Sequence, residues 1–406
     1  MSDLPMISLQ NIRIEYPLQG GLFKKDKFVA IKNVSMDIEK GDTWSIVGES
    51  GSGKTTLGMA IIGMTNVADG TIQYNLEDLQ FKISKSEKNF RQFRHLWKRI
   101  SIVFQDPFSA LDGRILVKDV INEPYVGHKL GTREEGYNKM KELIKDTGLK
   151  PIHLEYLPDQ LSGGLRQRVA ITRVLMLEPD FIVFDEPTSS LDVSVQAQIL
   201  NLILDTKEKT NLTYMFITHN LLVARHISKK ILVLYLGEVM EIGNTEEVFE
   251  KPLHPYTQLL MRSIPVPGKK SSLEKIELET TSASGYVSGC VFHNRCPVVT
   301  EFCGWNPGEI IDIISSEMYS ITGSENLDYE ILNDTHILIR DKDPENIKLM
   351  KKLIDESKVR RFKNSDIAED GLHIYLGEAW KPHLIQYGDK RQVNCIHYDA
   401  DFITLK

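Results

Sequence analysis

The sequence predicts an α/β fold organised around a phosphate-binding loop, and three stretches carry this prediction. Residues 43–47 (Thr-Trp-Ser-Ile-Val) indicate a short buried strand, and residues 57–62 indicate the first turns of a helix. A loop of glycine, serine and lysine, residues 48–56, joins them. Farther along, residues 181–184 are all apolar, as is typical of a strand buried on both faces of a parallel sheet.

The loop at residues 48–56 has the pattern of a P-loop. Its small residues let consecutive backbone N–H groups turn inward as a nest for an anion, and the helix N-terminus adds partial positive charge. Lys54 is placed to reach the β- and γ-phosphates, and Thr55 to offer a hydroxyl to Mg²⁺. The predicted phosphate-binding residues are Gly48, Glu49, Ser50, Gly51, Ser52, Gly53, Lys54, Thr55 and Thr56.

Two carboxylates follow the apolar strand at 181–184. Asp185 and Glu186 stand at its carboxyl end, which is where an α/β sheet places its chemistry. We expect Asp185 to hold Mg²⁺ through water and Glu186 to polarise the attacking water. A second apolar strand, residues 100–104, leads to Gln105, and a third, residues 214–218, ends in His219.

Two other features could contact a nucleotide. Residues 7–16 alternate between apolar and polar side chains, which indicates a half-buried strand. Its Tyr16 either stacks on a base or faces the core. Ser162 is a good N-cap for the helix predicted from Arg166 to Leu177, so this helix start offers N–H groups and a hydroxyl to a second anion.

Composition narrows the class of protein. The chain has 406 residues, enough for two domains or for one large domain with an appendage. A net charge of −7 and a pI near 5.9 argue against a nucleic-acid partner. The longest uninterrupted apolar run, residues 231–236, is too short to span a bilayer, and the N-terminus lacks signal-peptide features. We therefore expect a cytosolic protein whose membrane contact comes through a partner.

The cysteines form a second constellation. Cys290, Cys296 and Cys303 are separated by five and six residues, and Cys395 follows at a distance. Disulfides are rare in a reducing cytosol, so metal binding is the main alternative. These gaps are wider than those typical of zinc knuckles, and four thiolates suit a [4Fe-4S] cluster. The cluster, a zinc ion and free thiols remain open on this pattern.

Six motifs, taken in order, resemble the ATP-binding subunits of ABC transporters over about residues 5–265. They are the P-loop, Gln105, the Leu161-Ser162-Gly163-Gly164 signature, Asp185-Glu186, Asp192 and His219. The resemblance implies an ABC-type domain over residues 1–265. This domain would have an α/β ATP-binding core, an antiparallel β subdomain, and a helical subdomain near residues 106–175.

The same resemblance implies roles for the residues. Two such domains pair head to tail, so that each ATP lies between the P-loop of one and the signature of the other. Thr55, Gln105 and Asp185 would ligate Mg²⁺, Glu186 would be the general base, and His219 would sense the γ-phosphate. The residues that complete the partner's site or act across the dimer are Leu161, Ser162, Gly163, Gly164, Gln167 and Asp192. Asn220 departs from the family pattern, which often has a carboxylate after this histidine, and we expect the change to be tolerated.

Three further stretches resemble the importer ATPases for oligopeptides and dipeptides. They are residues 20–23, residues 104–111 and the His-Pro-Tyr-Thr segment at 254–260. Related importers carry nickel chelates or oligosaccharides, so these substrates are alternatives. The resemblance implies two permease subunits, an extracellular substrate-binding protein, a second ATPase subunit that is a copy or a different chain, and a peripheral position on the cytoplasmic face of the membrane.

A C-terminal extension, residues 266–406, is expected after this domain. The segment around Cys290 and Cys296 resembles the subfamily's cysteine-bearing tail, which implies a [4Fe-4S] cluster. Because 91 residues separate Cys303 from Cys395, we interpret residues 307–390 as an insertion. Strands at 335–340 and 372–376 and a helix after Asp343-Pro344 make it a small α+β segment.

Two rival functions are disfavoured. ATPases of DNA repair share these motifs but insert long coiled coils, whereas Lys54 and Ser162 are 108 positions apart here, without sustained heptads. A purely regulatory subunit that binds ATP without hydrolysing it would not need the intact Glu186 and His219.

Overall fold

The computed structural model describes most of the chain in two units. The described residues are 4–17, 27–77, 79–85, 90–264, 288–300, 302–305, 311–312, 314–316, 319, 327–333, 335–356 and 362–403. The first unit comprises residues 1–252 and 260–264, and the second comprises residues 253–259 and 265–406. The stretch at residues 20–23 lies outside the described residues.

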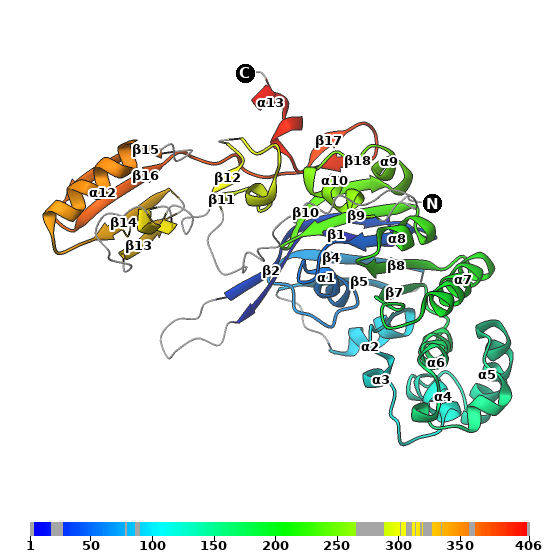
Figure 1. Ribbon diagram of the computed structural model, residues 1–406. Helices are drawn as coiled ribbons and strands as arrows, with labels where there is room; N and C mark the ends of the chain where they lie inside the picture. The colour runs from blue at the N-terminus through cyan, green and yellow to red at the C-terminus, as the bar shows by residue number, and fades with distance from the viewer. Residues whose placement is uncertain are drawn as a thin grey trace. The chain divides into compact units, whose positions relative to one another are not determined.

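A parallel group of strands forms the centre of the first unit (Figure 1). In it β3 (Thr43–Val47) lies between β8 (Thr213–Thr218) and β9 (Lys230–Tyr235), and β7 (Phe181–Asp185) and β6 (Ile100–Val103) continue the sheet beyond β8. Every residue of β3, β7 and β8 is buried. Continuous apolar runs become strands here because helices cover both faces of a parallel sheet. The α/β prediction is confirmed.

An antiparallel part continues the sheet on the other side of β9. The order runs from β10 (Glu238–Asn244) through β2 (Lys27–Ile38), β1 (Ile7–Pro17) and β4 (Asp69–Leu76) to β5 (Leu79–Ser84). The alternation predicted for residues 7–16 holds over much of β1, whose Ile7, Leu9, Ile12 and Ile14 are buried. Register shifts interrupt the pairing of β1 with β2, which curls this part of the sheet.

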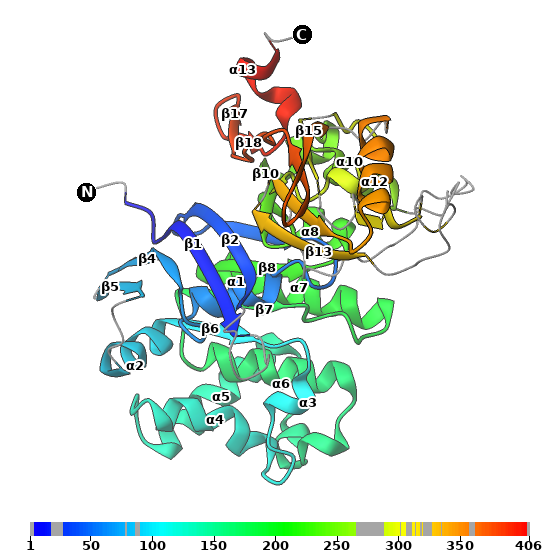
Figure 2. The ribbon, with the colours of Figure 1, turned by 90° about the vertical axis from the view of Figure 1, so that its left-hand side faces the viewer.

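The helices divide into two groups. The helices nearest the parallel strands are α1 (Lys54–Ile61), α7 (Val193–Thr210) and α8 (Leu221–Ile227). Helix α2 (Phe90–Arg99) contacts β5 and β6, and helix α9 (Thr245–Glu250) contacts β9 and β10. A separate helical group comprises α3 (Pro107–Ala110), α4 (Val117–Gly127), α5 (Arg133–Thr147) and α6 (Gly163–Leu175), with 3₁₀ turns at Pro151–Glu155 and Pro158–Gln160. Figures 1 and 2 both place α4, α5 and α6 side by side. Their own apolar core includes Val117, Ile121, Met140 and Val169.

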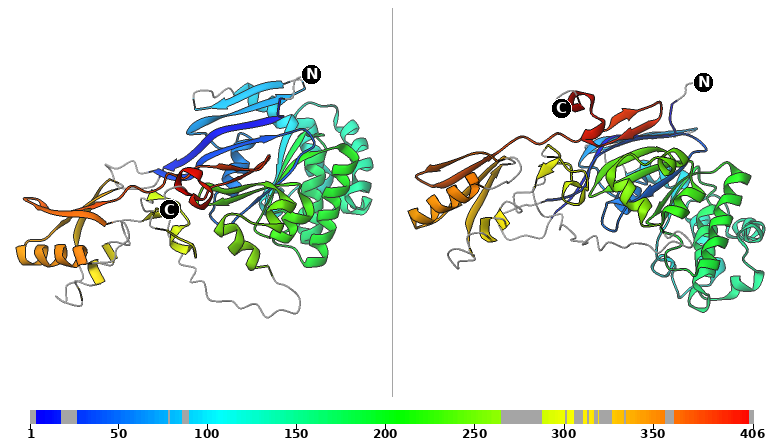
Figure 3. Two further views of the ribbon diagram at one scale, coloured as in Figure 1. Left: turned by 90° about the horizontal axis from the view of Figure 1, so that it is seen from above. Right: turned by 45° about the horizontal axis from the view of Figure 1, so that its top comes forward.

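The second unit contains a four-stranded antiparallel sheet. Its order is β13 (Asp328–Asn333), β14 (His336–Arg340), β16 (Gly371–Leu376) and β15 (Phe362–Ala368). Helix α12 (Pro344–Glu356) lies along one face of this sheet (Figure 3), where its Met350 and Ile354 pack on Ile337, Ile339 and Ile374. Strands and a helix thus stand where the sequence indicates them in this segment.

Short elements make up the remainder. They are α10 (Pro255–Arg262), β11 (Ser288–Gly289), β12 (Gly304–Trp305), β17 (Ile385–Tyr387), β18 (Arg391–Val393), α13 (Ala400–Ile403) and 3₁₀ turns at His293–Arg295 and Ile396–Tyr398. Among the described residues, no helix combines the length and the apolarity that crossing a membrane requires.

The second unit should lose stability in acid because of His254. Its side chain is buried, and its Nδ1 accepts a hydrogen bond from the Tyr256 backbone N–H at 3.0 Å. Burial lowers the pKa of His254 from 6.5 to about 3. Between these values the unfolded chain binds one more proton than the folded chain, so the free energy of unfolding decreases as the pH falls through this range.

The substitution His254→Asn tests this expectation, because an amide oxygen can replace Nδ1 as acceptor without titrating. Urea-unfolding midpoints of the full chain, measured at about pH 7 and about pH 5, should differ less for this variant than for the wild type. The control is His226→Asn, at an exposed position on α8. An equal pH response in the two variants would contradict the assignment.

Candidate functional site

The P-loop closes around its own lysine. Lys54, the first residue of α1, is 6% exposed, and its Nζ donates to the carbonyl oxygens of Gly48 at 2.9 Å and Glu49 at 2.8 Å. Burial lowers the pKa of Lys54, while the nearby carboxylates of Glu186, Asp185 and Glu49 raise it. The ammonium is therefore held inside the loop by acceptors that a phosphate can replace.

A hydrogen bond connects the start of α1 to the end of β7. The Thr55 hydroxyl donates to Oδ1 of Asp185 at 3.0 Å, although the two residues are 130 positions apart in sequence. Asp185 is buried, and this burial is the main cause that raises its pKa. The structure thus brings together two of the three side chains for which the sequence predicts a role in binding Mg²⁺.

Glu186 and His219 face each other beside this pair. His219 Nδ1 lies 3.1 Å from Glu186 Oε2, and the glutamate side chain is 15% exposed. Both residues line a cavity of about 50 Å³ together with Thr188, Gln196 and Asn220. A carboxylate and an imidazole at the edge of a polar cavity can position a water molecule and respond to a charge near it.

The backbone of Glu186 adopts a left-handed conformation with φ of 43°. Such a conformation costs on the order of 1 kcal/mol in a residue with a side chain. Three hydrogen bonds hold it: the Glu186 N–H donates to the carbonyl of Ile217 at 3.0 Å, and its carbonyl accepts from the Ser189 N–H at 3.2 Å and hydroxyl at 3.0 Å. Sequence reasoning missed Ser189, because a serine in a turn gives no specific signal.

Asn220 caps helix α8. Its Oδ1 accepts from the N–H groups of Leu222 at 3.0 Å and Val223 at 3.3 Å. A cap needs one acceptor oxygen, which asparagine supplies as well as aspartate does. This gives a physical reason why the chain can depart from the carboxylate expected at this position.

The signature residues belong to the helical group rather than to the P-loop region. Ser162 is the N-cap of α6, as predicted, and its hydroxyl oxygen accepts from the Leu165 N–H at 3.4 Å. Leu161 and Gln167 are buried, and Gly164 lies so close to Val195 that a Cβ there would be 2.4 Å from its side chain. In Figure 1, α6 lies with α4 and α5.

Three other predicted residues, Gln105, Asp192 and Tyr16, are at the surface. Gln105, in the loop after β6, and Asp192, at the start of α7, are both exposed. Tyr16 is 38% exposed near the end of β1, opposite Phe28 of β2, so it is not a core residue. Gly48 to Thr56 remain in one loop and helix start, as the motif requires.

The four cysteines of the second unit converge. Cys290, Cys296, Cys303 and Cys395 line one small, nearly closed cavity, together with His254, His293 and His397. Burial raises the pKa of Cys296 to about 11, and Thr300 donates its backbone N–H to Sγ of Cys303 at 3.2 Å. Within the described ranges, however, no three His, Cys, Asp or Glu side chains are arranged so that they could hold a metal ion. The described residues therefore contain no preformed cluster or zinc site.

The first unit is similar to ABC transporter cassettes of known structure. The dimeric structure of MJ0796, a bacterial ABC transporter cassette, matches 59% of this chain and 99% of its own, with a TM-score of 0.52 and 28% identity. CbiO1 from Clostridium perfringens, part of the ABC transporter complex CbiONQ, matches 61% of this chain and 92% of its own, with a TM-score of 0.51 and 26% identity. A family model described as "ABC transporter" matches residues 31–189. The first unit is thus an ABC ATPase cassette.

More specific matches define the family. A model for the C-terminal region of oligopeptide/dipeptide transporters matches residues 240–303. The oligopeptide transport ATP-binding protein AppF of Bacillus subtilis is 41% identical over 304 residues, which are 73% of this chain and 91% of AppF. AmiF of Streptococcus pneumoniae, also an oligopeptide transport ATP-binding protein, is 45% identical over 242 residues, 59% of this chain and 77% of AmiF. The chain belongs to the family of ABC transporter ATP-binding subunits for oligopeptides and dipeptides, and the resemblance inferred from its motifs is confirmed.

Proposed function

We propose that this protein hydrolyses ATP to drive the import of oligopeptides by an ABC transporter. The observation that carries the proposal is the convergence of Lys54, the Thr55–Asp185 pair and the Glu186–His219 pair at one edge of the sheet. AppF and AmiF are both oligopeptide transport ATP-binding proteins, which supports a peptide substrate. Importers of nickel chelates or oligosaccharides and non-transport ATPases are not favoured by these relatives.

The residues would divide the chemistry in the following way. The backbone N–H groups of residues 48–56, with Lys54, bind the phosphates of ATP, and Thr55, Gln105 and Asp185 hold Mg²⁺, which neutralises the developing charge. Glu186 orients and deprotonates the attacking water, and His219 contacts the γ-phosphate. Tyr16 stacks on the base. Because phosphoryl transfer needs little covalent chemistry from the protein, these groups act by position and charge.

The substitution Glu186→Gln should abolish turnover and leave ATP binding intact. The amide keeps the shape of the side chain but cannot accept a proton, so kcat should fall by at least about 100-fold. Equilibrium binding of Mg-ATP and steady-state release of phosphate measure the two effects separately. Glu208→Gln, an exposed change on α7, is the control. Turnover near the wild-type rate in Glu186→Gln would rule out the general-base role.

A second ATPase subunit would complete the site. In the proposed arrangement Leu161, Ser162, Gly163, Gly164 and Gln167 of one subunit close over the ATP of the other, and Asp192 acts across the interface. The exposed position of Asp192 and the dimeric state of the MJ0796 cassette support this pairing. The second subunit is a copy or a different chain. The other proposed partners are two permease subunits and an extracellular substrate-binding protein, with the ATPase bound peripherally at the cytoplasmic face.

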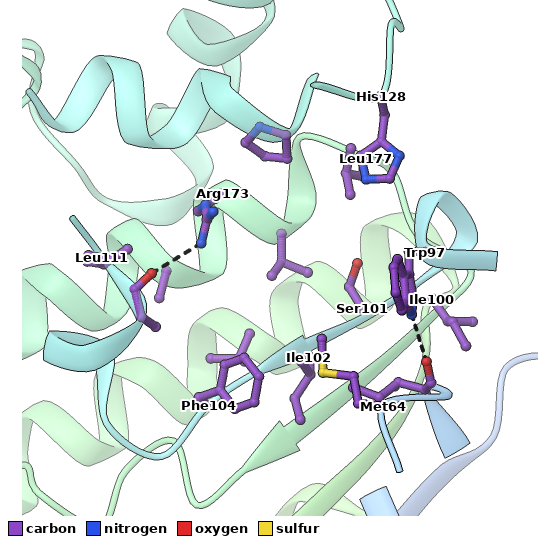
Figure 4. A pocket seen from close by; sticks show the side chains of 16 residues that line it. Met64, Trp97, Ile100, Ser101, Ile102, Phe104, Leu111, His128, Arg173 and Leu177 are labelled. Atoms are coloured by element: carbon purple, nitrogen blue, oxygen red, sulfur yellow. Dashed lines mark hydrogen bonds between the residues drawn. The ribbon is translucent and has the colours of Figure 1, made fainter. Parts of the chain in front are cut away.

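An apolar cavity of about 270 Å³ between β6 and the helical group is the proposed contact with the permease (Figure 4). Its lining includes Met64, Ile102, Phe104, Leu111 and Leu177. Its few polar groups include Arg173, which donates to the Ala110 carbonyl at 3.2 Å, and His128, whose pKa is lowered by burial. Arg173 is already ion-paired with Glu123 at 2.8 Å, so the apolar face of an amphipathic helix fits this lining. Because the cavity borders the strand that leads to Gln105, its occupant can sense that loop.

The substitution Met64→Arg tests this contact. Met64 is 54% exposed at the cavity, and an arginine there places a charge in an apolar contact. Basal ATP hydrolysis should be unchanged, whereas peptide transport by the assembled transporter should fall about tenfold or more. Val126→Arg, at an exposed position of α4 outside the cavity lining, is the matched control. Equal transport by both variants would contradict the contact.

For the remainder of the chain, we propose an ABC domain over residues 1–265 and a C-terminal extension over 266–406 with an inserted segment at about 307–390. Neither family model reaches beyond residue 303, which supports the insertion. The four cysteines would bind a [4Fe-4S] cluster, with zinc as the alternative. The convergence of the four thiols on one cavity supports this, although the side chains would have to move closer to reach a common cluster.

Anaerobic purification tests the cluster. The protein should be brown, with absorbance at about 400 nm and iron in the preparation, and Cys395→Ala should lose much of both. Ser189→Ala, in the other unit, should lose neither. One zinc per chain without iron, or no metal at all, would overturn the cluster assignment.

A further inference from the structure

We propose that the turn Leu236–Gly237 positions the phosphate loop for ATP. This inference rests on the proposed binding of ATP by residues 48–56. The turn joins β9 to β10, and its flanking residues Tyr235 and Glu238 are paired. It lies 185 positions from Ser52 in the sequence, and the motifs that identify an ATP site do not include it.

The turn has an unusual residue for its conformation. Leu236 and Gly237 have φ values of 44° and 78°, as in a type I′ turn, in which asparagine and glycine are strongly preferred. A leucine in the left-handed region is a genuine outlier because its Cβ crowds the backbone. Among the described residues, four other non-glycine residues with positive φ have ordinary explanations. Asn11 and Asn211 are asparagines, which tolerate the left-handed conformation. Lys129 and Glu178 follow the ends of helices, where this conformation is common. Glu186 and Leu236 remain, and Glu186 belongs to the site itself.

Gly237 and Leu234, on either side of Leu236, contact the phosphate loop through the backbone. The Gly237 N–H donates to the carbonyl of Ser52 at 2.9 Å, and the Gly237 carbonyl accepts from the Lys32 N–H at 2.9 Å. Three residues before Gly237, the carbonyl of Leu234 lies so close to Gly48 that a Cβ on this glycine would be 2.1 Å from it. The hairpin therefore contacts the phosphate loop at its first residue, Gly48, and at its middle residue, Ser52.

The hydrogen bond to Ser52 fixes the direction of a phosphate donor. A trans peptide is planar, so the Ser52 carbonyl and the Gly53 N–H point in opposite directions. When Gly237 holds the Ser52 carbonyl on the side of β10, the Gly53 N–H must point to the other side. That is the direction a backbone nest needs, because each N–H that turns away removes one donor from the anion.

The substitution Gly237→Ala tests the inference against a matched glycine. Alanine at 237 would adopt φ of 78° with its Cβ 2.5 Å from the Ala30 carbonyl, which displaces the turn from Ser52. Gly70→Ala meets the same difficulty, with φ of 85° and a Cβ 2.3 Å from the Asn11 carbonyl. Gly70 is the second residue of β4 and is not part of the phosphate loop or of the turn that contacts it. Both variants should lose thermal stability. Only Gly237→Ala should bind Mg-ATP more weakly, by about tenfold, the loss of one hydrogen bond.

A second measurement needs no change in the turn. Hydrogen exchange of the Gly237 amide, followed in Glu186→Gln to avoid turnover, should slow when Mg-ATP binds, and exchange of the Gly70 amide should not. Equal ATP affinity in Gly237→Ala and Gly70→Ala, or unchanged exchange at Gly237, would overturn the positioning role and leave the proposed function standing. Failure of the wild type to bind Mg-ATP would instead refute the proposed function and the inference together.

Discussion

The hydrogen bond between Thr55 and Asp185 is the contact on which the site depends. It joins the first turn of α1 to the last residue of β7, and it can form because β3, β8 and β7 are parallel. In a parallel sheet the carboxyl ends of all strands reach the same edge. The phosphate loop after β3, the carboxylates after β7 and the histidine after β8 therefore meet although they lie far apart in the sequence.

The charges at this edge are not balanced by the protein alone. Lys54 contributes one buried cation, and Asp185 and Glu186 contribute two carboxylates. Burial opposes charge on both Lys54 and Asp185, because it lowers the pKa of the first and raises that of the second. A divalent cation at Thr55 and Asp185 would favour the ionised carboxylate, and the phosphates of ATP would favour the ionised lysine. The site is therefore best satisfied when Mg²⁺ and a polyphosphate bind together.

The features that the sequence could predict are those that neighbouring residues determine. The P-loop, the Ser162 cap and the apolar strands follow from short patterns whose physics acts within a few residues, and each stands where it was expected. The contact between Gly237 and Ser52 could not be predicted, because Leu-Gly is a weak turn signal and nothing local indicates its partner. Cysteine spacing likewise suggested ligands but not their arrangement, since folded chain separates Cys303 from Cys395.

Two strained backbones flank the phosphate-binding edge, and they are held in a similar way. At Glu186 the neighbouring strand β8 supplies the carbonyl of Ile217, and at the Leu236 turn β2 supplies the N–H of Lys32. At Glu186 the strand holds the strained residue itself, and at the turn it holds Gly237, which follows the strained Leu236. Strain of this kind persists only where the surroundings determine the conformation. The direction of Glu186 and that of the loop carbonyl at Ser52 thus both depend on the rigidity of one sheet. The geometry of this edge is therefore a property of the whole fold and not of the motifs alone.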